Sequence, residues 1–205
     1  MYLPSGFQEQ DQESLLQLMR DYPFATLLTQ TQEGPYINHL PILAERRGPD
    51  QMVLIGHMAR ANPQWKQFES GEVRVVFQGP HTYITPQWYP DPLNVPTWNY
   101  AVVHAAGTVK VIDDLDGIES ILRKTVAEFE RHEPTPWKYD LPDEFRSGLV
   151  RAIVGFEIQV SRLEGKFKLS QNRTEAERQG VLEGLKTRKD EMSLKTLDLM
   201  RSLLV

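Results

Sequence analysis

The chain has 205 residues, a net charge of −5 and no cysteine. Its length suits one domain with a proper core, or one domain with a small appendage. The absence of cysteine excludes disulfides, thiolate metal sites and cysteine nucleophiles. Residues 1–20 lack the basic start and apolar run of an export signal, and no stretch is apolar enough to span a bilayer. We therefore expect a cytoplasmic protein that does not enter membranes.

The charge is spread unevenly along the chain. Residues 162–205 carry ten Lys and Arg against seven Asp and Glu, whereas the rest of the chain is acidic. Proteins bind nucleic acid largely by neutralising its phosphates with Lys and Arg. A modest basic tail on an acidic body is compatible with an anionic ligand, but it supports direct DNA binding only weakly.

The first half of the chain predicts one helix followed by strands. Residues 11–21 carry the apolar stripe of a helix, which Pro23 ends. The hydrophobic period then becomes that of strands, which we expect at residues 24–29, 36–43, 51–57, 72–78, 81–85 and 101–112. Between the third and fourth strands, Asn62 can cap a short helix that begins at Pro63. The short turns between strands favour an antiparallel arrangement.

The second half predicts helices around one more strand. A helix over residues 114–132 should bury Ile118, Ile121, Leu122, Val126 and Phe129. A loop and a short helix lead to a strand over residues 153–160.

The tail of the chain is expected to be helical. Thr174 and Glu177 have the spacing of a capping box, so a helix should start there. A last helix over residues 191–204 places Leu197, Met200 and Leu204 on one face. The class predicted is α+β, a β-barrel with peripheral helices.

Three clusters of residues could carry chemistry. In residues 56–63, Arg60 stands at the junction of a strand and a helix N-terminus, a natural site for an anion such as phosphate. The alternative is a solvated surface turn. Residues 77–89 and 95–100 alternate aromatic and hydrogen-bonding side chains, as the wall of a planar heteroaromatic ligand would. On these residues alone an ordinary core or a dimer interface is favoured.

The third cluster is residues 164–173, where three cations and several polar side chains precede the capped tail helix. This segment could close a polar ligand site or could be a solvated turn. No metal site is expected, because no two of the five histidines have ligand spacing on a predicted helix. A nucleophile elbow, a phosphate-binding P-loop and a dinucleotide fingerprint are absent from the sequence.

Taken together, the clusters resemble the PaiB family of FMN-binding proteins, which are named as negative transcriptional regulators. Nearly the whole chain carries the resemblance, in the family's order. The matching segments are Met1-Tyr2-Leu3-Pro4 with Phe7, His39-Leu40-Pro41, residues 56–65, residues 79–89, residues 95–100 with His104 and Gly107, and residues 164–173.

The resemblance implies an antiparallel split β-barrel with peripheral helices and a helical C-terminal tail. It implies a homodimer with FMN at the subunit interface. Residues 1–161 would form the FMN-binding split-barrel domain. Residues 162–205 would supply a flavin-closing loop and helices packed on the barrel or on the partner subunit.

The resemblance also implies which residues hold the flavin. Asn38, His39 and Leu40 would lie along the isoalloxazine ring, and Arg60 and Asn62 would approach the phosphate. A second group would come from the other subunit. The full set of expected cofactor-binding residues is Asn38, His39, Leu40, His57, Arg60, Asn62, Trp98, Asn99, Lys168, Gln171, Asn172 and Arg173.

Three functions compete at this point. The first is an FMN-binding regulator of the PaiB type, with DNA or a regulatory protein as its partner. The second is a flavin-dependent oxidoreductase acting on a small or aromatic substrate, in which the flavin supplies the redox chemistry. The third is an interaction scaffold that has lost the flavin. No catalytic acid or base stands out in the sequence.

Overall fold

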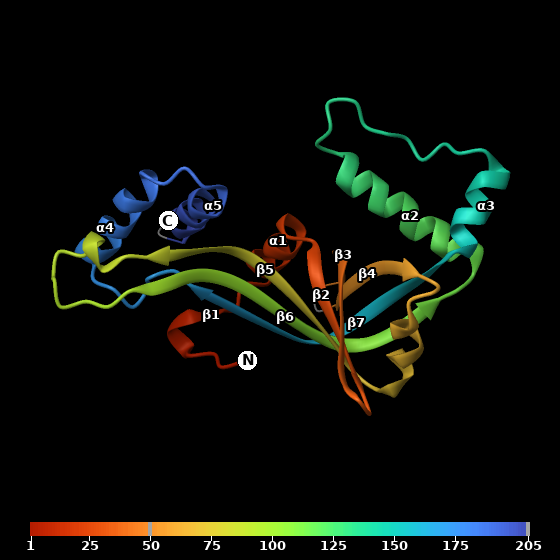
Figure 1. Cartoon of the computed structure of the whole chain (residues 1–205), viewed down its shortest axis with the longest axis horizontal. Coiled ribbons are helices and arrows are strands. Elements are labelled where there is room, and N and C mark those ends of the chain that lie inside the picture. The colour runs from red at the N-terminus through yellow and green to blue at the C-terminus, as the bar shows by residue number, and fades with distance from the viewer. Residues whose placement is uncertain (49–50, 204–205) are drawn as a thin grey trace. The chain divides into compact units, whose positions relative to one another are not determined.

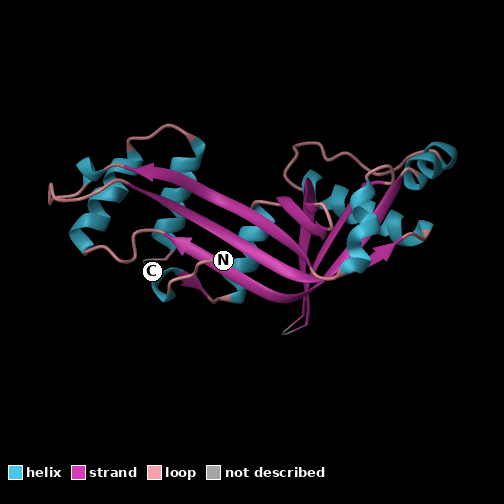
Figure 2. Cartoon of the chain, turned by 60° about the horizontal axis from the view of Figure 1, so that its bottom comes forward, coloured by secondary structure: helices cyan, strands magenta, loops and turns pink. Residues whose placement is uncertain are grey.

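A computed structural model describes residues 1–48 and 51–203 of the chain. Its elements in chain order are η1 (Ser5–Phe7), β1 (Gln8–Glu9), α1 (Gln12–Asp21), β2 (Phe24–Thr31), β3 (Gly34–Gly48), β4 (Gln51–Ala59), η2 (Pro63–Ser70), β5 (Val73–Ile84), η3 (Pro86–Trp88), β6 (Thr97–Ile112), α2 (Leu115–Glu130), α3 (Asp143–Arg151), β7 (Ile153–Lys168), α4 (Glu175–Lys186) and α5 (Glu191–Ser202). Figures 1 and 2 show these strands and helices.

The strands form one antiparallel sheet that closes on itself. The order is β1-β7-β4-β3-β2-β5-β6, and β7 also pairs with β6, which closes a ring of six strands. Closure pairs the edges of the sheet and so removes open edges. The two-residue β1 is added to the far end of β7, where Gln8 lies opposite Lys166. The predicted α+β class, with a mainly antiparallel barrel, is confirmed.

The chain forms two compact units. The barrel unit consists of residues 22–77 and 105–163, and the terminal unit consists of residues 1–21, residues 78–104 and the chain from Glu164 onward. Strands β5, β6 and β7 each pass from one unit into the other. In the barrel unit, Leu43, Val53 and Ile55 pack with Ile121 of α2 to form a core cluster. Apolar burial of this kind supplies most of the stabilisation of such a unit.

Two predicted strands, 72–78 and 81–85, are a single strand. Gly79 and Pro80, which lie between the two predicted strands, are both buried within β5. A Cβ on Gly79 would lie 2.9 Å from Leu18 and 3.1 Å from the carbonyl of Ala101. This glycine therefore permits close packing of α1 and β6 rather than a reversal of the chain.

The last strand is longer than residues 153–160, because β7 continues to Lys168. The first half of the predicted loop over residues 164–173 is thus strand. Gly165 pairs with Glu9, and a Cβ there would lie 2.1 Å from Leu15. The strand β1, which pairs with this end of β7, has only two residues, so its hydrophobic pattern is too short to predict a strand.

The helices agree with expectation at their starts. Asp114 caps α2, the Thr174–Glu177 capping box opens α4, and Asn62 caps η2, which is a 3₁₀ helix. Ile118 and Ile121 are buried as predicted, but Phe129 is 39% exposed, which corrects its predicted inward placement. Leu197 and Met200 are buried on α5, whereas Leu204 lies outside the described residues.

Candidate functional site

Three amide side chains meet beside the start of η2 in the barrel unit. The Asn62 side chain accepts a hydrogen bond from the backbone N–H of Gln64 at 3.0 Å. Gln64 is fully buried, and its Nε2 donates to the carbonyls of Leu27 and Tyr36, each at 3.1 Å. Those carbonyls belong to β2 and β3, so Gln64 fastens η2 to the hairpin that these strands form. Buried polar groups need such partners.

Asn38 is oriented by the same cluster. Its Nδ2 donates to Gln64 Oε1 at 2.8 Å, and Asn62 Oδ1 lies 3.5 Å away. Because Gln64 Nε2 is committed to two carbonyls, its Oε1 is the acceptor for Asn38, and this fixes which way the Asn38 amide points. The Asn38 carbonyl oxygen is thereby turned away from Gln64.

His39 and Leu40 follow Asn38 on β3. His39 is exposed on the opposite face of the strand, with Nδ1 3.0 Å from Thr26 Oγ1 and its ring 6.3 Å from that of Phe24. Leu40 is half-buried opposite Ala25 of β2. Successive strand residues point to opposite faces. Asn38 and Leu40 therefore share one face, and His39 lies on the other.

Arg60 ties the loop after β4 to other parts of the barrel unit. Its Nε donates to the carbonyl of Arg151 at 2.9 Å, and its Nη2 donates to the carbonyl of Ile153 at 2.9 Å and to Asp113 at 2.6 Å. The backbone N–H of Arg60 also donates to the carbonyl of Ala152. The guanidinium that the sequence suggested for a phosphate already holds protein acceptors in this structure.

His57 lies on β4 opposite Gly155 of β7. Its Nδ1 is buried and has no hydrogen-bond partner within the described chain. Burial lowers the pKa of His57, because the charged imidazolium is disfavoured away from water. The ring is therefore neutral near pH 7, with a buried nitrogen that a ligand or a water molecule could satisfy.

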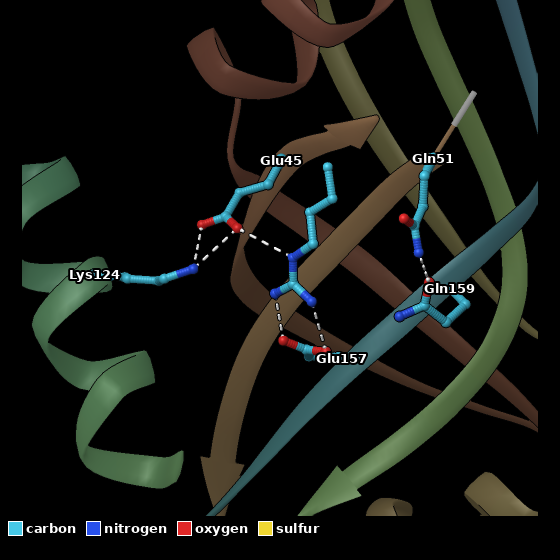
Figure 3. A network of polar contacts seen from close by, with 6 residues as sticks. Glu45, Gln51, Lys124, Glu157 and Gln159 are labelled. Atoms are coloured by element: carbon cyan, nitrogen blue, oxygen red, sulfur yellow. Dashed lines mark hydrogen bonds and ion pairs between the residues drawn. The ribbon is translucent and has the colours of Figure 1, made fainter. Parts of the chain in front are cut away.

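An ion-pair network lies between the sheet and helix α2 of the barrel unit (Figure 3). The Arg47 guanidinium binds both oxygens of Glu157, and Lys124 Nζ donates to the two oxygens of Glu45 at 2.9 and 3.0 Å. The hydrogen bonds from Arg47 hold the pKa of Glu157 below its usual range. These contacts link β3, β7 and α2. The charges are satisfied by one another, so this network is structural.

An aromatic group lies in the terminal unit. The Trp98 ring of β6 is 6.1 Å from that of Tyr83 and 6.4 Å from that of His81, both on β5. Trp98 is 52% exposed and Tyr83 39% exposed. Large rings left open to solvent in contact with one another are typical of a surface that binds a planar ligand or a partner.

Two lysines of β7 lie close to this group. Lys168 Nζ donates to the Thr97 hydroxyl and to the Trp98 carbonyl, the latter at 2.8 Å. Lys166 is 9% exposed and donates to the Tyr2 carbonyl at 3.0 Å. Burial lowers the pKa of Lys168, and the positive charges of Arg173 and Lys166 lower it further. The cations therefore repel one another.

Asn99 is fully buried on the other face of β6. Its Nδ2 donates to Ser170 Oγ at 2.9 Å and lies 3.4 Å from Met200 Sδ of α5. Ser170 has a φ of 67°, a left-handed conformation that is uncommon for residues other than glycine. The contact with Asn99 helps to hold that turn. Asn99 is thus placed to position the segment after β7.

The remaining expected residues follow that turn. Gln171 folds its amide back onto the backbone N–H of Leu169 and the carbonyl of Phe167. Arg173 donates to Asn94 at 2.7 Å, and its guanidinium lies 4.7 Å from the centre of the Tyr89 ring.

Asn172 lies between these two residues and is exposed. The twelve residues expected to bind the cofactor therefore fall into two groups. One group is in each unit of the chain.

A family model described as "Putative FMN-binding domain" matches residues 1–162. The chain is 35% identical to Protease synthase and sporulation protein PAI 2 of Bacillus subtilis (strain 168), over 98% of this chain and 96% of that protein. It is 34% identical to Uncharacterized protein AN0679 of Emericella nidulans, over 90% of each.

Solved structures share the fold. The flavocytochrome Anf3 of Azotobacter vinelandii superposes with a TM-score of 0.60 at 14% identity, over 78% of this chain and 69% of that one. The FAD and heme binding protein of Mycobacterium smegmatis gives 0.60 at 16% identity, over 78% and 73%. At this level of identity the likeness concerns the fold alone.

The fold and the family match together define a flavin-binding split barrel. The chain belongs to the FMN-binding domain family, and FMN is its cofactor. Its likeness to the sporulation protein PAI 2 extends along almost the whole of both chains. The predicted family and cofactor are confirmed, whereas the twelve site residues and the homodimer stay predictions.

Gln64, Tyr83 and Lys166 lie in segments that the sequence singled out, but they were not among the twelve residues expected to bind the cofactor. Gln64 directly follows the Asn62-Pro63 helix start, and no sequence pattern there indicates that its side chain is buried. Lys166 lay in what was predicted to be a loop, so its burial could not be predicted. The structure also contains no helix, among the residues it describes, that is long and apolar enough to cross a membrane.

Proposed function

We propose that this chain is an FMN-binding regulator of the PAI 2 kind that acts as a cytoplasmic homodimer. The observation that carries the proposal is the 35% identity that extends over 98% of this chain and 96% of PAI 2. Likeness over both full lengths supports a shared activity more strongly than a shared domain would.

The donor groups of the barrel unit suit a flavin. The pyrimidine edge of an isoalloxazine ring presents alternating carbonyls and nitrogens, which an oriented amide such as Asn38 can bind. We propose that Asn38 and Leu40 contact the ring from one face of β3. The neutral His57 has a buried nitrogen that can accept or donate. FMN supplies electron or hydride transfer when bound, and the protein supplies orientation and polarity.

We propose that Arg60 and Asn62 lie near the FMN phosphate but act on it indirectly. Since Arg60 holds Asp113 and two carbonyls, we propose that it acts on the phosphate chiefly by fixing the loop before η2. Asn62, which caps Gln64, fixes the same loop. The loop backbone and the start of η2 would then present N–H donors to the anion.

The terminal unit would supply the second group of contacts. Trp98, Lys168 and Asn172 are exposed or half-exposed and could touch FMN directly. Asn99, Gln171 and Arg173 are engaged with other parts of the chain and would position that group. We propose that these residues act on the flavin bound mainly by the partner subunit.

The outward face of the β2–β3 hairpin supports the dimer. Phe24 is 70% exposed and Ile37 is 49% exposed, and they share this face with His39, Thr26 and Leu28. Phe24 lies opposite Pro41, and Leu28 lies opposite Ile37. A sheet face with several apolar side chains open to solvent is typical of a subunit interface.

The regulator and the oxidoreductase are separated by one set of measurements. Fluorescence anisotropy with promoter and random duplexes, with and without FMN, measures any DNA binding across a salt series. We expect binding to be weak and steeply salt-dependent, because the chain is acidic overall. A flavin-dependent change in partner binding or dimer geometry supports the regulator. Brisk turnover with NAD(P)H and no such change would replace it with the oxidoreductase.

A further inference from the structure

Helix α3 of the barrel unit leaves one of its faces open to solvent. The helix packs beside α2 (Figure 1), where Val150 is 3% exposed and Arg146 Nε lies 3.5 Å from a Glu119 oxygen of α2. On another side of α3, Phe145 is 60% exposed and Leu149 is 44% exposed. These two apolar side chains are four residues apart and so lie next to each other on the helix. Large apolar side chains that are exposed together are typical of an interaction surface.

The open face continues through two small residues. Gly148 and Ala152 are exposed, and with Phe145 and Leu149 they have the spacing of a single helix face, which we call the α3 stripe. A Cβ placed on Gly148 would meet no atom of the described chain within 4 Å. A glycine inside a helix is less favourable than an alanine, because it loses more conformational freedom on folding. Packing within the described chain does not require this glycine, whereas the close approach of a second backbone would.

Two opposite charges flank the α3 stripe on one side. Glu144 and Arg151 are both exposed, and neither side chain forms an ion pair or a hydrogen bond with any residue that the structure describes. They are seven residues apart, so they lie on the same side of the helix and about 10 Å apart along its axis. One end of the α3 stripe is therefore negative and the other end is positive.

The α3 stripe is complementary to its own reversed copy. A two-fold axis beside Gly148 reverses the helix direction and places Phe145 of one helix against the Leu149 end of the other. A flanking residue stays on the same side under this rotation, so Glu144 of each chain comes beside Arg151 of the other. Gly148 lies where the two helices cross and lets their backbones approach. In symmetric pairs the same surface serves both subunits in this way.

Both ends of α3 are held in place within the barrel unit. The contact of Arg146 with Glu119 fastens the helix to α2. At the other end, Arg60 Nε donates to the carbonyl of Arg151 at 2.9 Å, and the Arg60 backbone N–H donates to the carbonyl of Ala152 at 2.8 Å. These bonds satisfy carbonyls that the end of a helix leaves without partners. A helix fixed in this way loses little conformational freedom when a partner binds to it.

We propose that α3 packs antiparallel against α3 of a second copy of this chain and thereby joins two homodimers into a tetramer. The inference rests on the proposed homodimer and adds a second contact to it, since the α3 stripe and the β2–β3 hairpin are different elements. Charge selects this occupant. A stripe with a carboxylate at one end and a guanidinium at the other matches its own reversed copy, whereas a basic or an acidic partner would match only one end.

Sedimentation equilibrium of the full-length, FMN-loaded protein tests the proposal. Two helices of nine residues bury less surface than a standard interface, so we expect weak association with a Kd of roughly 0.1–1 mM. The protein should therefore be dimeric near about 10 µM and should form tetramers at about 500 µM. Tetramer formation should weaken as salt rises, because the charge pairs are at the rim of the contact.

Charge reversal identifies the antiparallel geometry. Glu144→Arg and Arg151→Glu each place like charges together at two positions of the symmetric pair and should weaken tetramer formation by at least about tenfold. The double variant restores opposite charges and should associate within about threefold of the parent chain. Glu175→Arg, at an exposed carboxylate of α4, changes the net charge as Glu144→Arg does and is the control. It should leave association unchanged.

Gly148→Leu tests the close approach of the two helices separately from charge. Leucine favours a helix more than glycine does, and the Cβ has open space, so the free energy of unfolding in urea should not fall. The new side chain would lie at the crossing of the two helices and should weaken tetramer formation by more than about tenfold. A stable Gly148→Leu variant that associates as the parent does would contradict the proposed crossing.

The results separate the α3 contact from the proposed function. A dimer that persists up to about 500 µM, or a double charge variant as weak as the single variants, would overturn the contact between copies. The α3 stripe would then be open to a different protein. A chain that is monomeric near about 10 µM would refute the proposed homodimer instead. Pairing through α3 would in that case be measured as association of monomers, with the same response to charge reversal.

Discussion

The Asn38 side chain donates a hydrogen bond to Gln64 Oε1 at 2.8 Å, and Gln64 is fully buried. A buried residue therefore fixes the orientation of the Asn38 amide on β3. Gln64 in turn holds the carbonyls of Leu27 and Tyr36. One amide thus connects η2 with two strands and with the residue expected beside the flavin ring. The cluster links the stability of the barrel unit to the geometry of the candidate site.

Gln64→Leu should destabilise the chain. The substitution leaves two buried carbonyls and the Asn38 amide without their partner, and each such group costs roughly 1–3 kcal/mol. We expect the free energy of unfolding to fall by about 2–4 kcal/mol in urea denaturation. Gln87→Leu, at an exposed glutamine, is the control and should change it little. Equal stability of the two variants would show that the amide cluster is unimportant.

Much of the fold follows from local sequence signals. The starts of α2 and α4 depend on capping by Asp114 and Thr174, which act within one turn and can therefore be recognised in the sequence. The break predicted between residues 78 and 81, and the end of the last strand predicted at residue 160, were wrong because the roles of Gly79 and Gly165 are set by distant atoms, Leu18 and Leu15. Nothing local distinguishes a glycine that turns the chain from one that allows close packing.

The sequence predicted which types of residue form the candidate site, but not which residues these side chains contact. Residue types suggested rings, amides and cations near a flavin. The sequence could not show that Arg60 is held by Asp113 or that Asn99 is buried against Met200. Such partners lie more than fifty residues away along the chain. Their contacts arise only when β6, β7 and α5 come together.

His57 predicts a specific dependence of stability on pH. Its folded pKa lies below that of the unfolded chain, about 6.5. Below that value the unfolded state binds a proton that the folded state does not, so stability is lost as the pH falls from about 6.5. His57→Leu should show a smaller loss between pH 7 and pH 5 in parallel denaturation series. Identical pH profiles for parent and variant would contradict the assignment.

Arg60→Ala should weaken FMN binding by about 1.5–3 kcal/mol, the usual scale for a charge-assisted hydrogen bond. Asp113→Asn separates the two roles of Arg60, since the ion pair is exposed and contributes little to stability by itself. If Arg60 acts by fixing the loop, Asp113→Asn should also weaken binding, but by less. Titration of the apoprotein with FMN measures both. Unchanged affinity in Arg60→Ala would remove this residue from the site.

Ile37→Asp should disrupt the dimer. It places a charge on the outward face of the β2–β3 hairpin, where an interface would have to desolvate it. Sedimentation velocity at micromolar concentration should show a dimer for the parent chain and a monomer for the variant. Leu93→Asp, at a residue 90% exposed in the terminal unit, is the control and should remain dimeric. A monomeric parent chain would contradict the proposed assembly.

The central claim is that this split barrel carries FMN, and the visible absorption spectrum of the purified protein tests it most directly. The protein should be yellow or become so on reconstitution, with FMN released on denaturation in an amount equal to the protein chains. The apoprotein should also prefer FMN to FAD, because only one phosphate site is proposed. A colourless protein that takes up no FMN in titration would contradict the account.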